Sequence, residues 1–574
     1  MKKNKFIALA LAAGMTFCNV AATGVVAYAD PATEQTASNS YSLKITNSGN
    51  TKHTFEIYQI FKGTLSEENK VKTLSDIEWG DGVKSDYAKD HEATAAANEI
   101  TTVADAEKFA DDINSSLSNP TMSVDVDAGK DTTVSLPAGY YLVKDKDATQ
   151  TGDEAVYTQF LLRVVGDAEA TTKLDAPSSL KKVKENSSNT VNADGTEEDA
   201  RISGFAVGSQ YNDVADYSIG EAIPYELVGT LPSNYDKYDT YKYEFVDTMS
   251  TGLTLNTNDD KIKVYVKTSK DALKEDDITS AATITKDDHN LKVSFNDLKK
   301  AYPSATKDSV FIVRYEASLN SSAVIGLNGN ENTFHLEYSN NPNMGGDGST
   351  GETPDDKNIV FTYELDNTKI TYMSATDYAA LSGTDKEAYE ETSYDLDNDG
   401  TAETVYKRKL SGAKFKLYDA AKSGKGAVIE NGKFVEWTTD ATKVTELVSG
   451  DDGLVKIAGL DEGTYYLEET AAPTGYNKLT KRVKIAIEAT TDNSQKWDEN
   501  AANALTALTV QLNDGAVQNG NTEKGIVSTE IVNMPGAVLP STGGIGTTIM
   551  YVVGGILVIC GGAAIFIKRK KDAE

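Results

Sequence analysis

Short runs of alternating apolar and polar residues recur along most of the chain. Three of them are Thr54–Tyr58, Val264–Val266 and Phe311–Tyr315, and Gly, Asn and Asp residues separate such runs. Alternation with a period of two puts one face of each run in a core and the other in solvent, so the pattern predicts antiparallel strands packed as β-sandwiches. Helical periodicity is sparse, and the best segments are Val103–Ser118 and Asp377–Thr392. We therefore expect an all-β protein.

Two polar stretches interrupt this pattern and divide the chain. One covers residues 166–177, and the other, rich in Gly and Pro, covers residues 340–357. Composition of this kind is typical of the links between modules. It predicts three tandem immunoglobulin-like β-sandwich domains at about 30–172, 173–356 and 357–538, joined in an elongated chain. A body of this length has room for three separate cores.

The N-terminus has the pattern of a secretory signal peptide over residues 1–29. Lysines begin the chain, an apolar stretch covers about residues 6–20, and small residues precede the cleavage point. Both cysteines, Cys18 and Cys560, lie in terminal segments that would be removed, so the mature protein would have neither a thiol nor a disulfide. Extracellular proteins commonly rely on disulfides. Any covalent staple in this protein must therefore use other side chains.

Three elements follow one another at the C-terminus. An apolar run over residues 545–567 has about the length of a membrane-crossing helix, and the basic residues 568–571 after it favour the cytoplasmic side. The pentapeptide before the run consists of Leu539, Pro540, Ser541, Thr542 and Gly543. This order resembles the LPXTG sorting signal of Gram-positive surface proteins, and the alternative is an ordinary tail anchor. The resemblance implies that a sortase cuts after Thr542, joins its carbonyl group to an amine, and leaves the protein attached to the cell wall.

The charge of the chain narrows the classes of partner. The formal net charge is −31, and the basic terminal segments make the part between them more acidic still, which disfavours nucleic acid and anionic lipid as partners. The chain has 4 histidines and no phosphate-binding loop, dinucleotide fingerprint or zinc spacing, so we expect no cofactor and no metal. Residues 395–400 begin like a calcium loop, but the twelfth position is Tyr406 rather than Glu. We therefore expect an acidic turn there.

A long motif lies in the third domain. Residues 465–476 read YYLEETAAPTGY, which resembles the E-box, YxLxETxAPxGY, of sortase-assembled pilins. Residues 362–369 and 410–417 lie upstream, and residues 531–533 lie just before the sorting signal. These blocks are similar to the first, middle and last segments of a Cna-B-type sandwich. The resemblance therefore implies a Cna-B-type domain next to the sorting signal.

In that family a lysine of the first strand and an asparagine of the last strand join side chain to side chain beside a carboxylic acid. By position in the motif, the resemblance implies a bond between Lys369 and Asn533 with Glu469 as the catalytic acid. Burial lowers the pKa of a lysine and raises that of a glutamate, which favours a neutral amine and a protonated acid. Holding amine and amide side by side gives a high effective concentration. The alternative is a plain Lys–Glu ion pair.

The second domain has a parallel set of segments. Residues 177–183 open it, residues 243–253 lie in its middle, and residues 336–342 end it. They resemble the isopeptide-forming middle domain of the same pilins, in which Asp takes the role of Glu. The resemblance implies that Asp247 is the catalytic acid of a second bond.

The two residues joined by this second bond are less sharply defined. We predict Lys181 and Asn340. Lys182 is adjacent and would point to the other face of a strand, whereas Lys181 shares its face with an apolar neighbour. Asn341 is adjacent to Asn340, and Asn332 lies eight residues before it, so these positions stay open as alternatives.

The first domain has only a partial motif. Residues 139–145 read GYYLVKD and look like a degenerate E-box with a lysine where the acid would be. Lys44 in residues 41–45 could serve as a first-strand lysine, but an exposed strand position is the better interpretation. We predict no bond in this domain.

An acceptor amine would complete the chemistry of polymerisation. Backbone pilins carry such a lysine near the end of the first domain, often in a YPK-type motif, and here Lys173 occupies that place without the Tyr and Pro. The resemblance to LPXTG backbone pilins implies a structural subunit rather than an enzyme, joined head to tail through Lys173 and Thr542 and supporting adhesion. The partners implied are other copies of the chain, pilus-specific and housekeeping sortases, peptidoglycan and ancillary pilins. The alternatives are a monomeric wall-anchored adhesin or ancillary pilin, and a wall-anchored enzyme.

Overall fold

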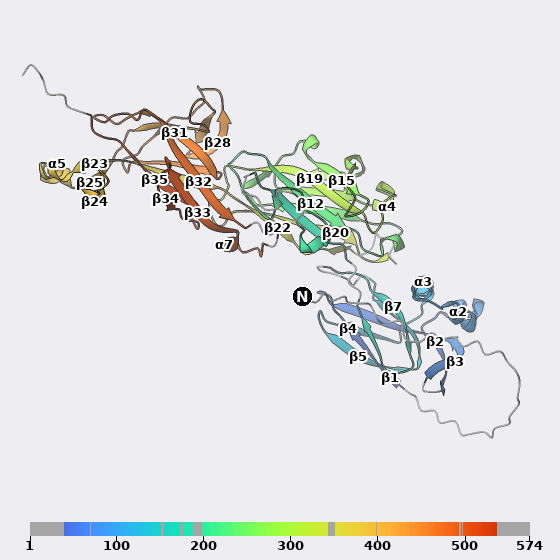
Figure 1. The fold of residues 1–574 in the computed structure, drawn as a ribbon. Helices are drawn as coiled ribbons and strands as arrows, with labels where there is room; N and C mark the ends of the chain where they lie inside the picture. Colours follow the sequence, from blue (N-terminus) through green and yellow to red (C-terminus); the bar gives the residue numbers. More distant parts are fainter. Residues whose placement is uncertain are drawn as a thin grey trace, which may run out of the picture.

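The computed structural model describes residues 40–68, 71–147, 149–150, 154–172, 176–186, 198–342, 350–397, 399–492, 495 and 497–536. Figure 1 shows three β-rich bodies in a row, coloured blue, green and orange to red along the chain, which confirms the expected all-β architecture. The predicted signal peptide, Lys173 and the sorting signal lie outside the described residues. No helix in the described ranges is long and apolar enough to cross a membrane.

The first body contains two sheets, of strand order β5-β1-β8 and β3-β2-β6-β7, with β4 beside β2. Its strands are β1 Ser40–Thr46, β2 His53–Glu68, β3 Val71–Trp79, β4 Met122–Val126, β5 Asp131–Pro137, β6 Gly139–Asp145, β7 Gln159–Val164 and β8 Ala168–Thr171. Its helices are α1 Ser85–Asp90, α2 Ala93–Glu99, α3 Val103–Ile113 and η1 Asn114–Ser116. The predicted helix at 103–118 is confirmed as α3 plus η1, and a capping box between Thr102 and Asp105 starts it.

The second body is a sandwich of two 7-stranded sheets around a core rich in tyrosine and phenylalanine. Its strands are β9 Ser179–Lys184, β10 Tyr211–Asn212, β11 Val214–Asp216, β12 Ile223–Thr230, β13 Tyr243–Met249, β14 Leu253–Leu255, β15 Lys263–Lys267, β16 Asp276–Asp277, β17 Thr283–Lys286, β18 Asn290–Phe295, β19 Val310–Leu319, β20 Asn330–Ser339, β21 Thr350–Glu352 and β22 Asp356–Phe361. Its helical turns are η2 Ala200–Ile202, η3 Tyr235–Lys237, η4 Asp259–Lys261, η5 Thr279–Ala281 and α4 Leu298–Ala301.

The third body is a single 13-stranded sheet whose strands enclose their own apolar core. Its strands are β23 Tyr363–Ser374, β24 Glu390–Tyr394, β25 Glu403–Lys409, β26 Lys414–Tyr418, β27 Gly426–Glu430, β28 Lys433–Thr438, β29 Leu447–Val448, β30 Leu454–Leu460, β31 Gly463–Ala471, β32 Val483–Thr491, β33 Leu505–Leu512, β34 Val517–Asn519 and β35 Ile526–Val532. Its helices are α5 Ala375–Ala379, α6 Gly383–Lys386 and α7 Ala501–Ala504.

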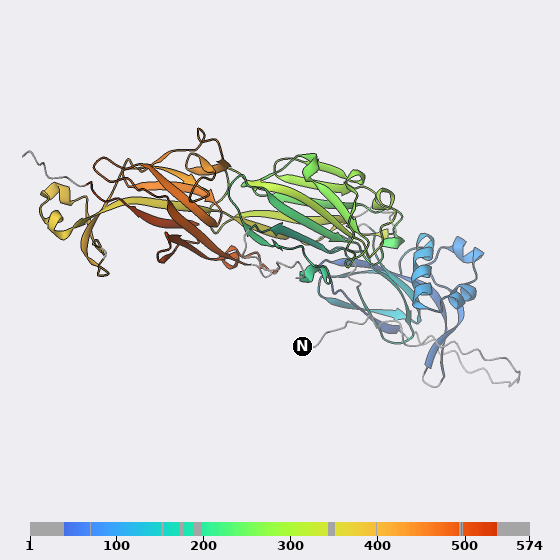
Figure 2. The same ribbon diagram turned by 45° about the horizontal axis from the view of Figure 1, so that its top comes forward.

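The segment from α5 to β25 projects from the end of the third body (Figure 2), and the single helix predicted at 377–392 is wrong. Residues 380–382 separate two short helices, and Gly383, a residue of low helix propensity, begins the second one. The residues after them form β24, which pairs antiparallel with β25. Pairing with the next strand along the chain therefore overrides the local helical pattern.

The boundary between the second and third bodies is sharp. Strand β22 pairs with β20 and β11, so residues 356–361 belong to the second sandwich. Strand β23 starts the third body at Tyr363, and only Thr362 separates the two strands. The boundary in the structure thus lies about five residues after the one expected from composition. The polar stretch used for that expectation ends before β22, which still belongs to the second body.

Acidic side chains are buried where these two bodies meet. Asp461 accepts a hydrogen bond from Asn186 Nδ2 at 2.9 Å, and its backbone N–H donates to Ser218 Oγ at 3.1 Å. The backbone N–H of Asp216 donates to Glu185 Oε2 at 3.0 Å. Burial, and then the charge of Asp461, raise the pKa of Asp216 well above its ordinary value. Burial also raises the pKa of Asp461, although its hydrogen bond from Asn186 opposes the shift.

Candidate crosslinking sites

Three strands of the third body bring the predicted triad together. Lys369 lies in β23 and is paired in parallel with Ile531 of β35, so Asn533 follows β35 on the same side of the sheet. Glu469 lies in β31, opposite Phe415 of β26. The side chains of alternate residues point into the core, and all three residues of the triad are at most 1% exposed.

The contacts within this group are close and specific. The amine of Lys369 contacts Asn533 Oδ1 and lies 3.1 Å from Glu469 Oε1. Asn533 Nδ2 donates to the same Glu469 Oε1 at 2.9 Å, and Glu469 Oε2 accepts from the backbone N–H of Leu479 at 2.7 Å. Amine, amide and acid are therefore in mutual contact in a dry interior.

Burial controls the reactivity of this lysine. Desolvation lowers the pKa of Lys369 from its ordinary value, although the charge of Glu469 opposes the shift. The amine also lies 5.5 Å from the centroid of the Phe415 ring. A lysine in such surroundings more readily presents the neutral, nucleophilic amine. The arrangement can support attack of Lys369 Nζ on the amide carbon of Asn533.

The second body holds a similar group at the centre of its sandwich. Lys181 of β9 contacts Asp247 of β13, and its amine lies 3.0 Å from the hydroxyl of Tyr315 in β19. Tyr315 donates to Asp247 Oδ1 at 2.9 Å and accepts from Asn332 Nδ2 at 2.8 Å. Lys181 and Asn332 are 0% exposed and Asp247 is 1% exposed. Desolvation lowers the pKa of Lys181 and raises that of Asp247, which favours the neutral forms of both.

The structure does not bring Asn340 to this group, and the prediction for that residue is corrected. Asn340 Nδ2 donates to the backbone oxygen of Gln150 in the first body at 3.4 Å, and Asn341 Nδ2 donates to Asp147 Oδ1 at 3.2 Å. Asn332 lies in β20 and Asn340 directly follows this strand with the same parity, but eight residues of extended chain separate them by roughly 27 Å. The pairing of Asp247 with Phe334 places Asn332, two residues away, at the level of the acid.

Lys182 lies on the opposite face of β9 in a different environment. Its amine is 2.7 Å from Asp199 Oδ2 and 2.6 Å from Asp213 Oδ1, and all three side chains are buried. Burial opposes ionisation of Asp199, but Arg201 and Lys182 outweigh it and hold the pKa of that carboxyl below its usual range. Asp199 is thus held as a carboxylate beside Lys182. It is not the protonated acid that bond formation needs.

The motif comparison put a lysine at the position of the E-box acid in the first body, and the structure corrects this. The inward-facing acid is Asp145. Asp145 pairs with Phe55 as Glu469 pairs with Phe415. Its side chain is 0% exposed, with both oxygens 2.9 Å from His53 Nδ1. Burial raises the pKa of Asp145. A histidine therefore takes the place of the amine beside this acid.

The two lysines considered for the first body lie away from this acid's carboxylate. Lys44 is partly exposed and forms an ion pair with Asp131 at 2.8 Å. Lys144 is buried on the other face of β6, where its amine donates to Asn114 Oδ1 at 3.0 Å. Neither side chain reaches the carboxylate of Asp145 in the described contacts, and the absence of a bond in this body stays a prediction.

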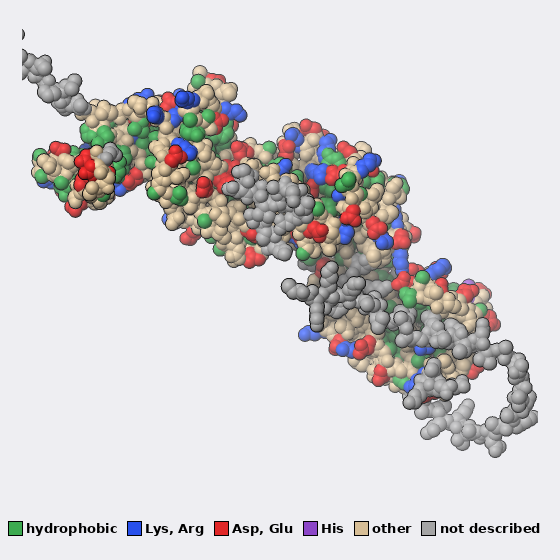
Figure 3. Space-filling model, in the orientation of Figure 1, with side chains coloured by type: hydrophobic (Ala, Val, Ile, Leu, Met, Phe, Trp, Pro, Cys, Tyr) green, Lys and Arg blue, Asp and Glu red, His purple; other side chains and the backbone are tan. Residues whose placement is uncertain are grey.

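The acidic turn in the third body gathers carboxylates. Ligand oxygens of Asp395, Asp397 and Glu403 lie within 4.8 Å of one another. Backbone N–H groups already bind some of these carboxylate oxygens, because those of Asp399 and Gly400 donate to Asp395 at 3.1 and 2.9 Å. The turn is exposed to partly exposed, and acidic side chains are spread over the visible face of all three bodies (Figure 3).

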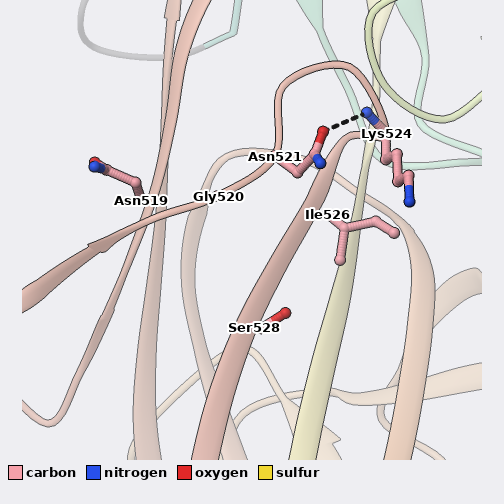
Figure 4. A pocket seen from close by; sticks show the side chains of 6 residues that line it. All are labelled: Asn519, Gly520, Asn521, Lys524, Ile526 and Ser528. Carbon is pink, nitrogen blue, oxygen red and sulfur yellow. Dashed lines mark hydrogen bonds between the residues drawn. The ribbon is translucent and has the colours of Figure 1, made fainter.

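A hollow lies beside the turn between β34 and β35 (Figure 4). Its lining residues are Asn519, Gly520, Asn521, Lys524, Ile526 and Ser528. Lys524 is the one titratable side chain in this lining, and its backbone N–H donates to Asn521 Oδ1 at 3.0 Å. The hollow thus offers an isolated amine, whereas general acid–base catalysis needs a positioned partner for the proton.

Comparison with protein families assigns three segments of the chain. Residues 219–342 match the Gram-positive pilin backbone subunit 2, Cna-B-like domain. Residues 401–501 match the SpaA family, a prealbumin-like fold domain, and residues 534–574 match the LPXTG cell wall anchor motif. These matches confirm the predicted resemblance to pilins, the sorting signal and the location at the Gram-positive cell wall.

Individual relatives are distant. The trypsin-resistant surface T6 protein of Streptococcus pyogenes serotype M6 is 26% identical over 379 residues, which are 62% of this chain and 66% of that protein, just under two thirds. The solved T6 backbone pilin of serotype M6 Streptococcus pyogenes has a TM-score of 0.46 at 18% identity, covering 87% of this chain and 99% of that chain. The full-length major pilin SpaD from Corynebacterium diphtheriae has a TM-score of 0.40 at 14% identity, covering 87% and 98%.

Proposed function

We propose that this protein is the structural backbone subunit of a covalently polymerised pilus, stabilised by one internal isopeptide bond in each of its second and third domains. The observation that carries the proposal is the contact of Lys369, Asn533 and Glu469 in a dry core. This group ends six residues before the LPXTG motif at Leu539. A covalent tie at that point would hold the last strand of the subunit where tension enters it.

Polymerisation would join successive copies through their ends. A sortase breaks the Thr542–Gly543 peptide bond, and the segment from Gly543 onward leaves with the amine. The Thr542 carbonyl then passes to the Lys173 amine of the next copy, which loses one proton. A housekeeping sortase would make the same exchange with an amine of peptidoglycan, and ancillary pilins would enter by their own sorting signals. The fibre would thus support adhesion.

The internal bonds would form by a second exchange of amides, without any enzyme. The neutral amine of Lys369 attacks Cγ of Asn533, the new C–N bond forms, and the bond from Cγ to Nδ2 breaks. The nitrogen leaves as ammonia after it takes up one proton, and the amine has lost one. Glu469 lies against both nitrogens and can pass that proton. Lys181, Asp247 and Asn332 would do the same in the second domain.

A lysine substitution tests the polymer. In cells with the pilus sortase, Lys173→Ala should abolish the ladder of high-molecular-weight species on denaturing gels while the monomer remains. Lys130→Ala, an exposed lysine of the first domain, should leave the ladder as it is. A ladder that survives in the Lys173→Ala variant would reject this lysine as the acceptor. A wild-type protein that forms no ladder would instead favour a monomeric wall-anchored adhesin or ancillary pilin.

Intact mass tests the internal bonds. Monomer from cells that lack the sortase should be lighter than its sequence mass by two ammonias. Digestion should yield two crosslinked peptides, one with Lys369 and Asn533 and one with Lys181 and Asn332. A protein of full sequence mass would contradict both bonds without bearing on the polymer.

A further inference from the structure

The hydroxyl of Tyr315 lies at the centre of the site in the second domain. It is 3.0 Å from the amine of Lys181, accepts from Asn332 Nδ2 at 2.8 Å, and donates to Asp247 Oδ1 at 2.9 Å. The hydroxyl therefore touches the nucleophile, the nitrogen that must leave and the acid. Tyr315 is 2% exposed, so water cannot readily replace it in this position.

In the third domain, the acid contacts the leaving nitrogen without a tyrosine between them. There the acid is a glutamate, and Asn533 Nδ2 donates directly to Glu469 Oε1 at 2.9 Å. Among the described residues, no tyrosine hydroxyl forms a hydrogen bond with Lys369, Asn533 or Glu469. The acid of the second domain is an aspartate, whose side chain is one methylene shorter. Asn332 acts on this acid through its side chain, and a hydrogen-bonded route from the acid to the asparagine also runs through Tyr315.

This contrast deepens the proposed function and rests on it. We propose that Tyr315 is a catalytic residue of the second crosslink, which relays a proton from Asp247 to the leaving nitrogen of Asn332. As the bond from Cγ to Nδ2 of Asn332 breaks, Nδ2 takes the hydroxyl proton and leaves as ammonia. Tyr315 regains a proton from Asp247, and Asp247 regains one from Lys181 Nζ, which is now an amide nitrogen. Protons and atoms balance, and no oxidant or cofactor takes part.

The surroundings hold the hydroxyl in place and protonated. The Tyr315 ring stacks on Tyr225 with centroids 5.2 Å apart and planes 7° apart. The amine of Lys181 lies 5.0 Å from the centroid of the Tyr225 ring. Burial raises the pKa of Tyr315 well above its ordinary value. A phenol in this state keeps its proton at neutral pH and can act as a donor and acceptor in turn.

The test follows the second bond over time. The full chain is made in a cell-free reaction, samples are denatured at intervals, and the fraction of the peptide that joins Lys181 to Asn332 is measured by mass spectrometry. In Tyr315→Phe this bond should form on the order of a hundredfold more slowly than in wild type, the usual effect of losing a positioned proton donor. The bond between Lys369 and Asn533 in the same molecules should form at the wild-type rate.

Two further variants separate a chemical role from a structural one. In Tyr315→Phe combined with Asp247→Glu, the longer acid should come closer to the leaving nitrogen of Asn332 and restore the bond. Tyr243→Phe is the matched control, because this tyrosine is 0% exposed in the same sandwich and donates only to a backbone oxygen, that of Thr230, at 2.8 Å. It should form the bond at the wild-type rate.

The outcomes are distinct. Slow formation in Tyr315→Phe with rescue by the longer acid supports the relay. Wild-type formation in Tyr315→Phe overturns it, and so does a loss that the longer acid does not rescue while circular dichroism matches that of Tyr243→Phe. If wild type itself lacks the bond between Lys181 and Asn332, the proposed crosslink of the second domain fails, and the relay fails with it.

Discussion

Replacing Glu469 with glutamine removes only the acid from the triad of the third domain. Glutamine keeps the shape of the side chain and can still accept from the backbone N–H of Leu479, which Glu469 does at 2.7 Å. It cannot supply or collect the proton that the leaving nitrogen of Asn533 needs. We therefore expect Glu469→Gln to fold, to lack the bond from Lys369 to Asn533, and to lose one of the two ammonia deficits.

The length of the closed loop sets the size of the effect on stability. Lys369 and Asn533 are 164 positions apart, and the chain-entropy relation for crosslinks assigns about 5 kcal/mol to a loop of that length. In a domain of about 150–250 residues, 1 kcal/mol shifts Tm by roughly 2–4 °C. The third domain of Glu469→Gln should therefore melt roughly 10–20 °C below wild type.

Calorimetry and intact mass on the same samples measure both effects. Glu468→Gln is the control. Glu468 is the residue next to Glu469, its side chain is 38% exposed, and it pairs with Arg482 at 2.9 Å. Loss of such a surface pair costs about 0–1 kcal/mol, and this control should keep both deficits. A Glu469→Gln protein that keeps both deficits would show that the acid is not needed. One that loses a deficit but melts within a few degrees of wild type would refute the loop-closure reasoning.

Three other outcomes are expected. Asn332→Ala should remove one ammonia deficit, whereas Asn340→Ala should keep both, as measured by intact mass. Lys182→Met removes one of the two cations that pair with the buried carboxylates of Asp199 and Asp213, the other being Arg201. It should lower the free energy of unfolding by up to about 3–5 kcal/mol, measured in denaturant, with both deficits unchanged. Because burial raises the pKa of Asp216 and Asp461, the folded state holds more protons than the unfolded state. Stability from this junction is therefore full below the unfolded pKa near 3.8 and is lost as pH rises through the raised values. The Tm of wild type should fall as pH rises above about 4, and Asp461→Asn should flatten this slope, whereas an unchanged slope would contradict the assignment.

Local patterns were enough for the third domain. The E-box fixes Glu469 within one strand, and alternation along that strand turns its side chain inward with the tyrosine and leucine of the motif. Lys369 and Asn533 lie in the first and last segments of the same domain, and their separation along the sequence does not matter once those segments are recognised. The structure brings these three residues into contact.

Long-range pairing decided what the local patterns left open. Asn332 lies in β20 and Asn340 directly follows it with the same parity, so no local rule separates them. Only the register between β13 and β20 sets which one lies level with Asp247. In the first domain the motif put a lysine where the acid would be, whereas the inward-facing acid lies one residue further along, and a slip of one position exchanges the two faces of a strand. The pairing with β2 turns Asp145 inward.

The sequence by itself determined the class of the protein: alternating strands, an LPXTG sorting segment, cysteines confined to the two terminal segments, and a lysine, an acid and an asparagine at recognisable places in one domain. These features are local, because periodicity and short motifs act over a few residues. Only the tertiary structure decided the asparagine of the second site, the separate environments of Lys181 and Lys182, and the place of Tyr315 between acid and amide. Those depend on strand register and on the packing of two sheets against each other, which join residues far apart in the chain.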